Sequence, residues 1–433
     1  MSGAMIPYST QCIDDDDINA VVSTLKSDFI TQGAKVDEFE HKIADFVGAK
    51  YAVCFNSATS ALNVAYKIVK CDLSNRGAIK GDSQVEFLTT PLTFCATANM
   101  MVENGIMPKF CAINKMGNID ENNLQISPNV RAIVSVDYAG NSVEVENIAK
   151  ICKENNLYFI SDSSHSFGGA YNRRKIGAFA DMTIFSFHAV KPITTIEGGA
   201  ITTNSELFYN TAKLLRSHCI VKTELWESEI ISDFARLDSG DLPITSSLQG
   251  VAQNHSNPRS AASLRESEAN KAIQDLDSHN LGANCANFIG HNFRLSDVAA
   301  SLGISQLKKI ESFLATRHQI AKIYDDAFNS ESKFRTIKIP AHIYSTYHLY
   351  PILLDSTLVP HKKAIFSALL KAGLGVQVHY KPIYQFAPYK NHAPIKTADD
   401  FYNAEISIPC HQKMSANDAD FVISAIHKIF SQF

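Results

Sequence analysis

One lysine and one aspartate are the pair in this sequence whose types and surroundings could do chemistry. Lys191 stands before Pro192 and shortly after the apolar run 182–187, and Asp162 closes another apolar run that begins at Leu157. An amine held among apolar side chains loses proton affinity, because burial disfavours its charged form, and it becomes a nucleophile for carbonyl carbon. We therefore expect Lys191 to be buried and reactive.

The pair matches the needs of one coenzyme, pyridoxal phosphate (PLP). PLP needs a lysine for its aldehyde and a carboxylate for its pyridinium nitrogen, because the positive charge on the ring makes it an electron sink. Lys191 would supply the amine and Asp162 the carboxylate. Taken singly, Lys191 would be interpreted as a surface lysine and Asp162 as a cap or turn residue, so the prediction depends on both.

Both residues are expected to follow buried strands. Apolar runs that end abruptly in polar residues are typical of such strands, and an open α/β sheet binds its ligands at their carboxyl ends. Further runs of this kind occur at 51–55, 85–90, 132–136 and 200–203, and helical patterns separate most of them. These continuous runs predict an α/β fold with a mostly parallel, doubly wound sheet.

Two helix starts behind these strands could contact a coenzyme. The helix after 51–55 opens around Ala58 and Thr59, and free N–H groups at such a junction bind phosphate, although a Ser/Thr-rich start is usually only a cap. Phe94 is expected in the first turn of the helix that follows Pro91. An aromatic ring there could stack on a flat coenzyme, whereas core packing is the more frequent role of a lone phenylalanine.

Length and composition predict two domains and a large core. The chain has 433 residues, of which 45% are hydrophobic. We expect a large domain over 1–310 and a smaller C-terminal α/β domain over 311–433. A long helix from Asp297 to about residue 329 would connect them, and strands are predicted over 347–352 and 375–380 in the smaller domain. The segment from about 222 to 286 is polar and lacks sustained apolar periodicity, so we interpret it as a solvated insertion in the large domain, with a lid or a partner-binding element as the alternative.

Charge and cysteine usage exclude several classes of protein. A net charge of −4 argues against a nucleic-acid or anionic-membrane surface. No apolar run approaches the roughly 20 residues that a membrane span needs. The nine cysteines form no CxxC motif and no Cys/His cluster at zinc spacing, so we expect no metal site. Scattered cysteines of this kind are typical of reduced thiols in a cytoplasmic protein.

Three motifs together resemble a known family. The segments 162–165, 185–191 and 197–200 are similar to those of the DegT/DnrJ/StrS sugar aminotransferases, which are PLP enzymes of fold type I. The similarity covers nearly the whole chain outside the insertion, and it is greatest to the branch on the route to pseudaminic acid. The resemblance implies a PLP-dependent aminotransferase that converts a UDP-linked 4-keto-6-deoxy-N-acetyl sugar to the 4-amino sugar, with L-glutamate as amino donor.

The resemblance also implies roles for single residues. Lys191 would hold PLP and move a proton, Asp162 would keep the ring nitrogen protonated, and His165 would bond near the ring hydroxyl. Ser186 would hold the phosphate, and the family pattern favours stacking for Phe94. The phosphate would also be held by Ala58 and Thr59.

Further residues are assigned by the resemblance to the substrate and to a second subunit. Asn292, in the segment 290–297, would reach the coenzyme phosphate in the partner's site, which implies a homodimer with shared active sites. The residues expected against the nucleotide sugar are Tyr8, Asp28, Phe29, Ile30, Thr31, Ala58, Ser186, Asn292, Gln377, Val378, His379 and Tyr380.

Three alternatives differ from this interpretation. A related enzyme of the same family could aminate another nucleotide-linked keto sugar, for example in a perosamine- or bacillosamine-type C4 amination. A dehydrase branch of the family carries histidine where this chain has Lys191, so the lysine argues against it. A non-catalytic regulator on the same scaffold would be expected to lack the lysine or Asp162, and both are present.

Overall fold

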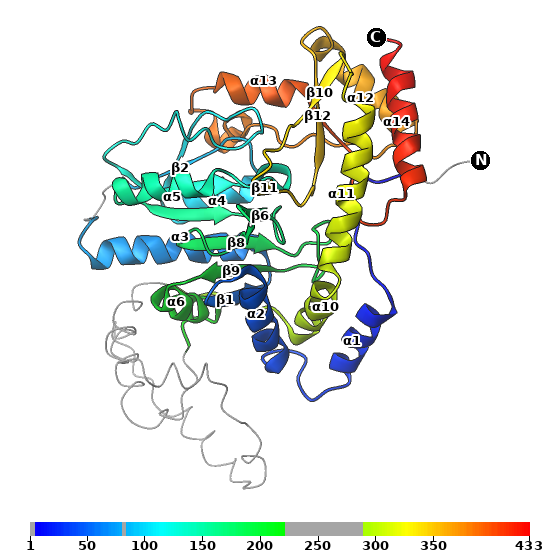
Figure 1. The fold of residues 1–433 in the computed structure, drawn as a ribbon. Helices are drawn as coiled ribbons and strands as arrows, with labels where there is room; N and C mark the ends of the chain where they lie inside the picture. The colour runs from blue at the N-terminus through cyan, green and yellow to red at the C-terminus, as the bar shows by residue number, and fades with distance from the viewer. Residues whose placement is uncertain (1–4, 80–83, 221–288) are drawn as a thin grey trace, which may run out of the picture.

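A seven-stranded sheet forms the centre of the molecule (Figure 1). The computed structural model describes residues 5–79, 84–220 and 289–433. The strand order is β1-β9-β8-β5-β4-β2-β3, and neighbouring strands are parallel except at β9, which is antiparallel to both β8 and β1. The mostly parallel sheet is therefore confirmed. Its strands are β1 (Tyr51–Phe55), β2 (Glu86–Thr89), β3 (Met107–Phe110), β4 (Val130–Val136), β5 (Tyr158–Asp162), β8 (Met182–Ser186) and β9 (Gly199–Thr203).

Helices cover both faces of this sheet because successive side chains of a strand point to opposite sides. In β1, Ala52 and Cys54 belong to one apolar core, whereas Val53 and Phe55 belong to another. The first core is covered by α2 (Ala34–Val47), α5 (Val145–Glu154) and α10 (Asp297–Leu307), and the second by α3 (Ala58–Asn75), α4 (Cys95–Glu103) and α6 (Glu206–Arg216). The sheet is therefore doubly wound, as the continuous apolar runs predict.

The C-terminal part of the chain has an apolar core of its own. An antiparallel sheet in the order β10-β12-β13 packs there against three helices, and α11 runs along this part beside α14 (Figure 1). The elements are β10 (Phe334–Thr336), β12 (Tyr350–Leu354), β13 (Glu405–Ile408), α11 (Ile310–Ala327), α12 (Lys362–Lys371) and α14 (Ala416–Phe430). The remaining elements include α1 (Asp15–Leu25), α13 (Lys396–Ala404), and the small sheet of β11 (Ile343–Tyr344), β6 (Ala170–Tyr171) and β7 (Arg174–Lys175).

Two predictions of local structure were wrong. The single long helix expected from Asp297 to about residue 329 is divided between α10 and α11. Lys309 at the break binds Asp14, the N-cap residue of α1, at 2.7 Å and Asp17, in the first turn of α1, at 2.6 Å. The strand expected over 375–380 forms only one isolated bridge. That bridge joins Gln377 to Ser407 of β13, and the residues just before it, Gly373 and Gly375, bond to Ile6 near the N-terminus. Long-range contacts of this kind leave no periodic pattern in the sequence.

Within the seven-stranded sheet one strand escaped prediction, as did the short strands β6, β7, β10 and β11 elsewhere, and one predicted segment lies outside the described residues. The edge strand β3 contains Pro108 and Lys109, which are residues typical of sheet edges and unlike a buried run. The polar insertion at about 222–286 falls outside the described residues. No helix within the described ranges is long and apolar enough to cross a membrane.

Phe39 on α2 supports the strand end that leads to Lys191. Its side chain is fully buried, and its ring lies 5.4 Å from that of Phe187, which directly follows β8. We expect Phe39→Ala to lower the free energy of unfolding by about 3–5 kcal/mol, because a large buried ring is replaced by a cavity. The control Phe421→Ala, at a position 49% exposed on α14, should change it by less than about 0.5 kcal/mol. Urea unfolding at one protein concentration measures both, and equal losses would contradict this packing.

Candidate active site

A cavity of about 440 Å³ opens at the carboxyl edge of the sheet. Val136, Asp162 and Ser186 line it, and these are the last residues of β4, β5 and β8. The starts of α3 and α4 form a second wall. The C-terminal part of the chain closes it with His348, His379 and Tyr380. Residues from distant parts of the sequence therefore converge where an α/β sheet binds its ligands.

Lys191 reaches this cavity from a loop that begins and ends on the sheet. Backbone hydrogen bonds from Phe187 to Gly198 and from Thr195 back to Phe187, both 2.9 Å, close the loop between β8 and β9. Gly199 then passes directly under the start of α3, where a side chain would collide with the backbone of Ala58. A glycine at position 199 is therefore required by this close approach.

The surroundings of Lys191 lower the pKa of its amine. The residue keeps some accessible surface as part of the cavity wall. Burial lowers the pKa of its amine to about 8, the carboxylate of Asp162 opposes that change, and the guanidinium of Arg317 adds to it. Nζ lies 3.3 Å from Nε2 of His348. A lysine with this pKa provides roughly one uncharged amine in ten at pH 7, far more than a surface lysine does.

Asp162 is a buried carboxylate whose oxygens are bonded by neutral groups. The hydroxyl of Thr97 donates to Oδ2 at 2.7 Å, and the hydroxyl of Ser164 donates to Oδ1 at 2.6 Å. The backbone N–H of Ser164 also donates to Oδ1, at 3.3 Å. These bonds fix the carboxylate without neutralising its charge, which stays available for a cation in the cavity.

His165 is a neutral side chain bonded across to the C-terminal part. Its Nε2 lies 2.9 Å from the hydroxyl of Tyr380, and its ring packs 4.4 Å from that of His348. Burial holds the pKa of His165 well below its usual range, and Lys191 and His379 add to this effect. Burial likewise raises the pKa of the Tyr380 phenol. This wall therefore carries polar groups but no charge.

The start of α3 and the end of β8 form the anion-binding end of the cavity. Ser57 caps the helix by accepting the N–H of Ser60 at 3.1 Å, and Ala58 and Thr59 line the cavity within the first turn. Ser186 lies opposite them at the end of β8. The N–H groups and dipole of a helix start favour a phosphate at this position.

The structure gathers most of the predicted residues and leaves others outside. Tyr8 and Phe94 line the cavity, and Phe94 is the N-cap residue of α4 with an exposed ring rather than part of its first turn. The predicted residues that do not line the cavity of this single chain are Asp28, Phe29, Ile30, Thr31, Asn292, Gln377 and Val378, of which all but Val378 are exposed.

Sequence reasoning missed three residues of this region. His348 was placed inside a strand predicted over 347–352, whereas β12 begins at Tyr350 and His348 lies on the loop before it. Thr97 and Arg317 gave no signal, because each lies within a helix and reaches the site only through tertiary contacts. A histidine between two tyrosines at a strand start is the one local pattern that could have indicated His348.

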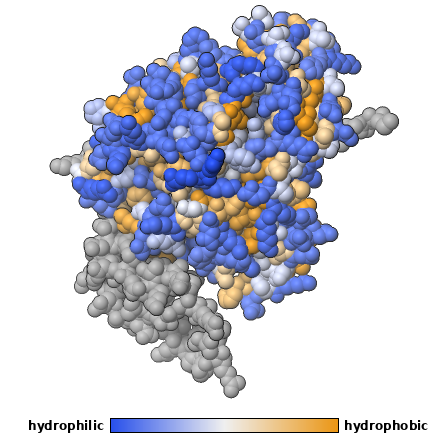
Figure 2. Space-filling model, in the orientation of Figure 1, coloured by the Kyte–Doolittle hydropathy of each residue, from blue (hydrophilic) through white to orange (hydrophobic). Residues whose placement is uncertain are grey.

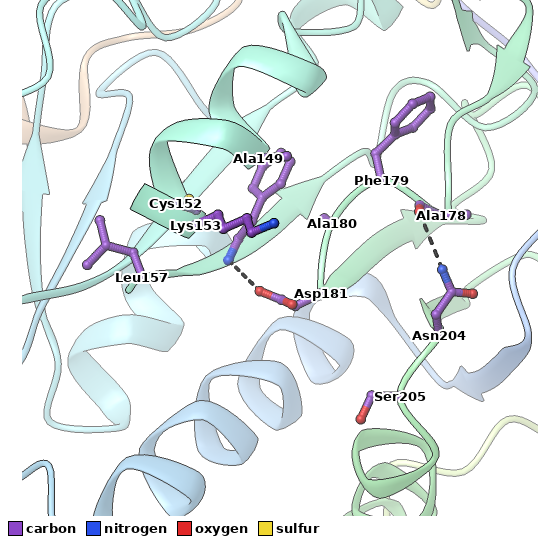
Figure 3. Close-up of a pocket in the computed structure, with 11 residues that line it drawn as sticks. Ala149, Cys152, Lys153, Leu157, Ala178, Phe179, Ala180, Asp181, Asn204 and Ser205 are labelled. Carbon is purple, nitrogen blue, oxygen red and sulfur yellow. Dashed lines mark hydrogen bonds between the residues drawn. The ribbon is translucent and has the colours of Figure 1, made fainter. Parts of the chain in front are cut away.

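A second cavity, of about 550 Å³, lies at the opposite edge of the sheet (Figure 3). In its wall, Asp181 accepts the N–H of Phe159 at 2.8 Å and Asn204 donates to the carbonyl of Ala178 at 3.4 Å. Lys153 also lines this cavity, and the bonds of Asp181 and Asn204 join segments next to the strand ends. In the part of the chain that the structure describes, no three His, Cys, Asp or Glu side chains converge in a way that could hold a metal ion.

The sheet topology and the paired amine and carboxylate define an α/β transferase of fold type I, the class of PLP-dependent aminotransferases. Comparison with known proteins gives the family. The chain belongs to the DegT/DnrJ/EryC1/StrS aminotransferase family, whose model matches residues 11–240 and 256–427.

Curated relatives and a solved structure match over nearly the full length. The chain is 40% identical over 436 residues to the UDP-4-amino-4,6-dideoxy-N-acetyl-beta-L-altrosamine transaminase of Campylobacter jejuni, covering 99% of this chain and 98% of that one. The Helicobacter pylori transaminase of the same name is 39% identical over 431 residues, with 98% of each covered. The structure of Helicobacter pylori PseC, an aminotransferase involved in the biosynthesis of pseudoaminic acid, is 38% identical with a TM-score of 0.80, covering 99% of this chain and 100% of that chain.

The lowered pKa of Lys191 gives a direct test of its burial. In the coenzyme-free protein, acetylation of Lys191 by a trace of acetic anhydride should reach half its maximal rate near pH 8, because only the uncharged amine reacts. The acetylation of Lys322, which is 75% exposed on α11, should reach half its maximal rate more than one pH unit higher. Mass spectrometry of the two peptides across pH 6–11 measures both rates, and coincident profiles would show that Lys191 is solvated.

Proposed function

We propose that this chain is a PLP-dependent aminotransferase that converts a UDP-linked 4-keto-6-deoxy-N-acetyl sugar to the 4-amino sugar. L-glutamate is the proposed amino donor, and the route to pseudaminic acid is the proposed context. The observation that carries the proposal is the convergence of Lys191 and Asp162 on one cavity at the carboxyl edge of the sheet. The names of the Campylobacter and Helicobacter relatives, similar over nearly the whole chain, support the substrate.

The residues of the cavity fit PLP. Asp162 offers a fixed charge for the pyridinium nitrogen, and Lys191 offers an amine with a lowered pKa for the aldehyde. The start of α3 suits the phosphate, and Phe94 exposes a ring face on which a flat coenzyme can stack. When bound, PLP supplies an electron sink for the electrons left on the substrate carbon after a proton departs.

The chain itself contributes proton transfer, orientation and a wall free of charge. The uncharged Nζ of Lys191 can accept a proton from the substrate carbon as a general base, and the ammonium so formed can then donate that proton to a second carbon as a general acid. Thr97 and Ser164 hold Asp162 in one orientation, so its charge stays aligned with the cavity. The neutral His165 supplies hydrogen bonding without a second positive charge beside Lys191.

A homodimer with shared sites is part of the proposal. Asn292 and the segment 28–31 are exposed in the single chain, so they could serve a partner's cavity. Figure 2 shows apolar side chains gathered in the region of α1. Exposed apolar patches of this kind typically mark interfaces. The residues here are Ile18, Val22, Leu25, Phe29 and Ile30, each 38% exposed or more.

The remaining parts of the proposal concern domains and location. The separate core of the C-terminal part supports a boundary near residue 310 between a large and a small domain. We place the reaction in the cytoplasm, where nucleotide sugars are made and thiols stay reduced. Neither nucleic acid nor a membrane is a proposed partner, because the net charge of the chain is −4.

The function is tested with purified protein, PLP, L-glutamate and a panel of UDP-linked 4-keto sugars. Mass spectrometry should detect the amino sugar, and the PLP-loaded protein should show a visible absorbance band. Lys191→Ala should lose the band and at least about 10³-fold in turnover, because both the amine that holds PLP and the proton carrier are removed. Lys322→Ala, at an exposed position, should retain both. Full activity in Lys191→Ala would exclude the assigned role.

Shared sites are tested by mixing inactive protomers. If Asn292 serves the partner's cavity, a mixed dimer of Lys191→Ala and Asn292→Ala chains contains one intact site, since both lesions fall in the other. Activity should therefore recover to about a quarter of wild type in a 1:1 random mixture, half of whose dimers are mixed. Absence of recovery in mixed dimers verified by native mass spectrometry would place Asn292 outside the partner's site.

A further inference from the structure

The amine of Lys191 has a hydrogen-bond partner from the C-terminal part of the chain. In the described residues, the one hydrogen-bond partner of the Lys191 side chain is Nε2 of His348, at 3.3 Å. His348 is 2% exposed, lines the cavity, and packs its ring 4.4 Å from that of His165. It lies between β11 and β12, on a segment that belongs to neither the sheet edge nor the loop of Lys191.

We propose that His348 is a further catalytic residue, whose Nε2 accepts a hydrogen bond from Nζ of Lys191 and directs that amine into the cavity. The part of His348 in turnover rests on the proposed function, whereas its hydrogen bond to Lys191 does not depend on that function.

The direction of this hydrogen bond follows from the chemistry of the two groups. A lysine ammonium has donors only, so Nε2 of His348 must accept whenever Lys191 is charged. The hydrogen of the neutral imidazole is then on Nδ1, which is sealed from solvent and has no hydrogen-bond partner. Burial, together with Lys191 and His165, holds the pKa of His348 well below its usual range. His348 therefore stays a neutral acceptor and does not take the proton itself.

A neutral acceptor suits an amine that must gain and lose a proton. A carboxylate at this distance would stabilise the ammonium strongly and raise its pKa towards that of a surface lysine. The imidazole stabilises the ammonium less, so the amine remains available as a base. The imidazole also fixes the direction of one N–H of Lys191. The other N–H groups of Nζ, or its lone pair when the amine is uncharged, are then left to face the cavity.

Arg317 holds the backbone that presents His348. Tyr347, directly before it, has a positive φ of 45°, an unfavourable conformation for a bulky residue. Nη1 of Arg317 donates to the carbonyls of Tyr347 at 2.9 Å and of His348 at 3.4 Å, and the hydroxyl of Ser345 accepts the N–H of Tyr347 at 3.0 Å. Arg317 is completely buried, so these bonds are shielded from water. It is a positioning residue.

The same segment is tied, on both sides of His348, to the loops that follow β4 and β5. The N–H of Thr346 donates to the carbonyl of Gly140 at 3.1 Å, and the N–H of Leu349 donates to that of Ala139 at 3.2 Å. The hydroxyl of Thr346 also donates to the carbonyl of His165 at 2.6 Å. The position of the imidazole relative to Lys191 is therefore fixed from both parts of the chain.

The test is the pKa of Lys191 in coenzyme-free protein, measured by trace acetylation across pH. In His348→Phe, this pKa should fall by about one to two units, because a hydrogen bond that favours the ammonium is lost. His348→Gln, which keeps a carbonyl acceptor, should recover most of the shift. The matched control is His291→Phe, which removes a histidine whose Nε2 lies 2.8 Å from Nζ of Lys67 and should leave Lys191 unchanged.

An unchanged pKa of Lys191 in folded His348→Phe would overturn the proposal. If that variant does not fold, Ser345→Ala replaces it. Ser345→Ala releases the turn at Tyr347 and should lower the pKa in the same direction by a smaller amount, and no shift would again overturn the proposal. The titration uses neither PLP nor substrate, so its result is independent of the proposed aminotransferase reaction, which the absorbance band of Lys191→Ala tests separately.

Discussion

Burial of one amine is the constraint on which this structure depends. Moving an ammonium away from water costs free energy, and the protein meets that cost by lowering the pKa of Lys191 instead of pairing it directly with a carboxylate. Among the described residues, the hydrogen-bond partner of the Lys191 side chain is the neutral imidazole of His348. Asp162 acts from further away, and its oxygens are already bonded by Thr97 and Ser164. The site thus keeps one positive and one negative group apart, with room for a ligand between them.

The fold supplies this arrangement through convergence of strand ends. The ends of β5 and β8 carry Asp162 and the loop of Lys191, and the start of α3 adds an anion-binding end. The C-terminal part then contributes three polar side chains to the opposite wall, and buried Arg317 holds the backbone of one of them in place. Neither part of the chain lines the cavity alone.

Much of this site could be predicted from local pattern. Apolar runs that end in polar residues predicted the parallel sheet and the place of Lys191, Asp162 and Ser186 at its carboxyl edge, and the structure confirms the sheet. The errors at Lys309 and His348 share one physical cause, which is dependence on contacts distant in sequence. The break at Lys309 depends on the acids at the start of α1, and the position of His348 depends on Arg317. No local pattern records either contact. The roles of Asn292 and of residues 28–31 remain predictions, since a second subunit would have to complete them.

The most direct measurement is to reduce the PLP-loaded protein with borohydride and locate the modified residue by peptide mass spectrometry. Reduction fixes the coenzyme permanently to whichever amine holds it. The structure predicts the pyridoxyl group on Lys191, because burial there lowers the pKa of the amine to about 8 beside the charge of Asp162. A pyridoxyl group on another lysine, or none in protein that turns over substrate, would contradict the central claim.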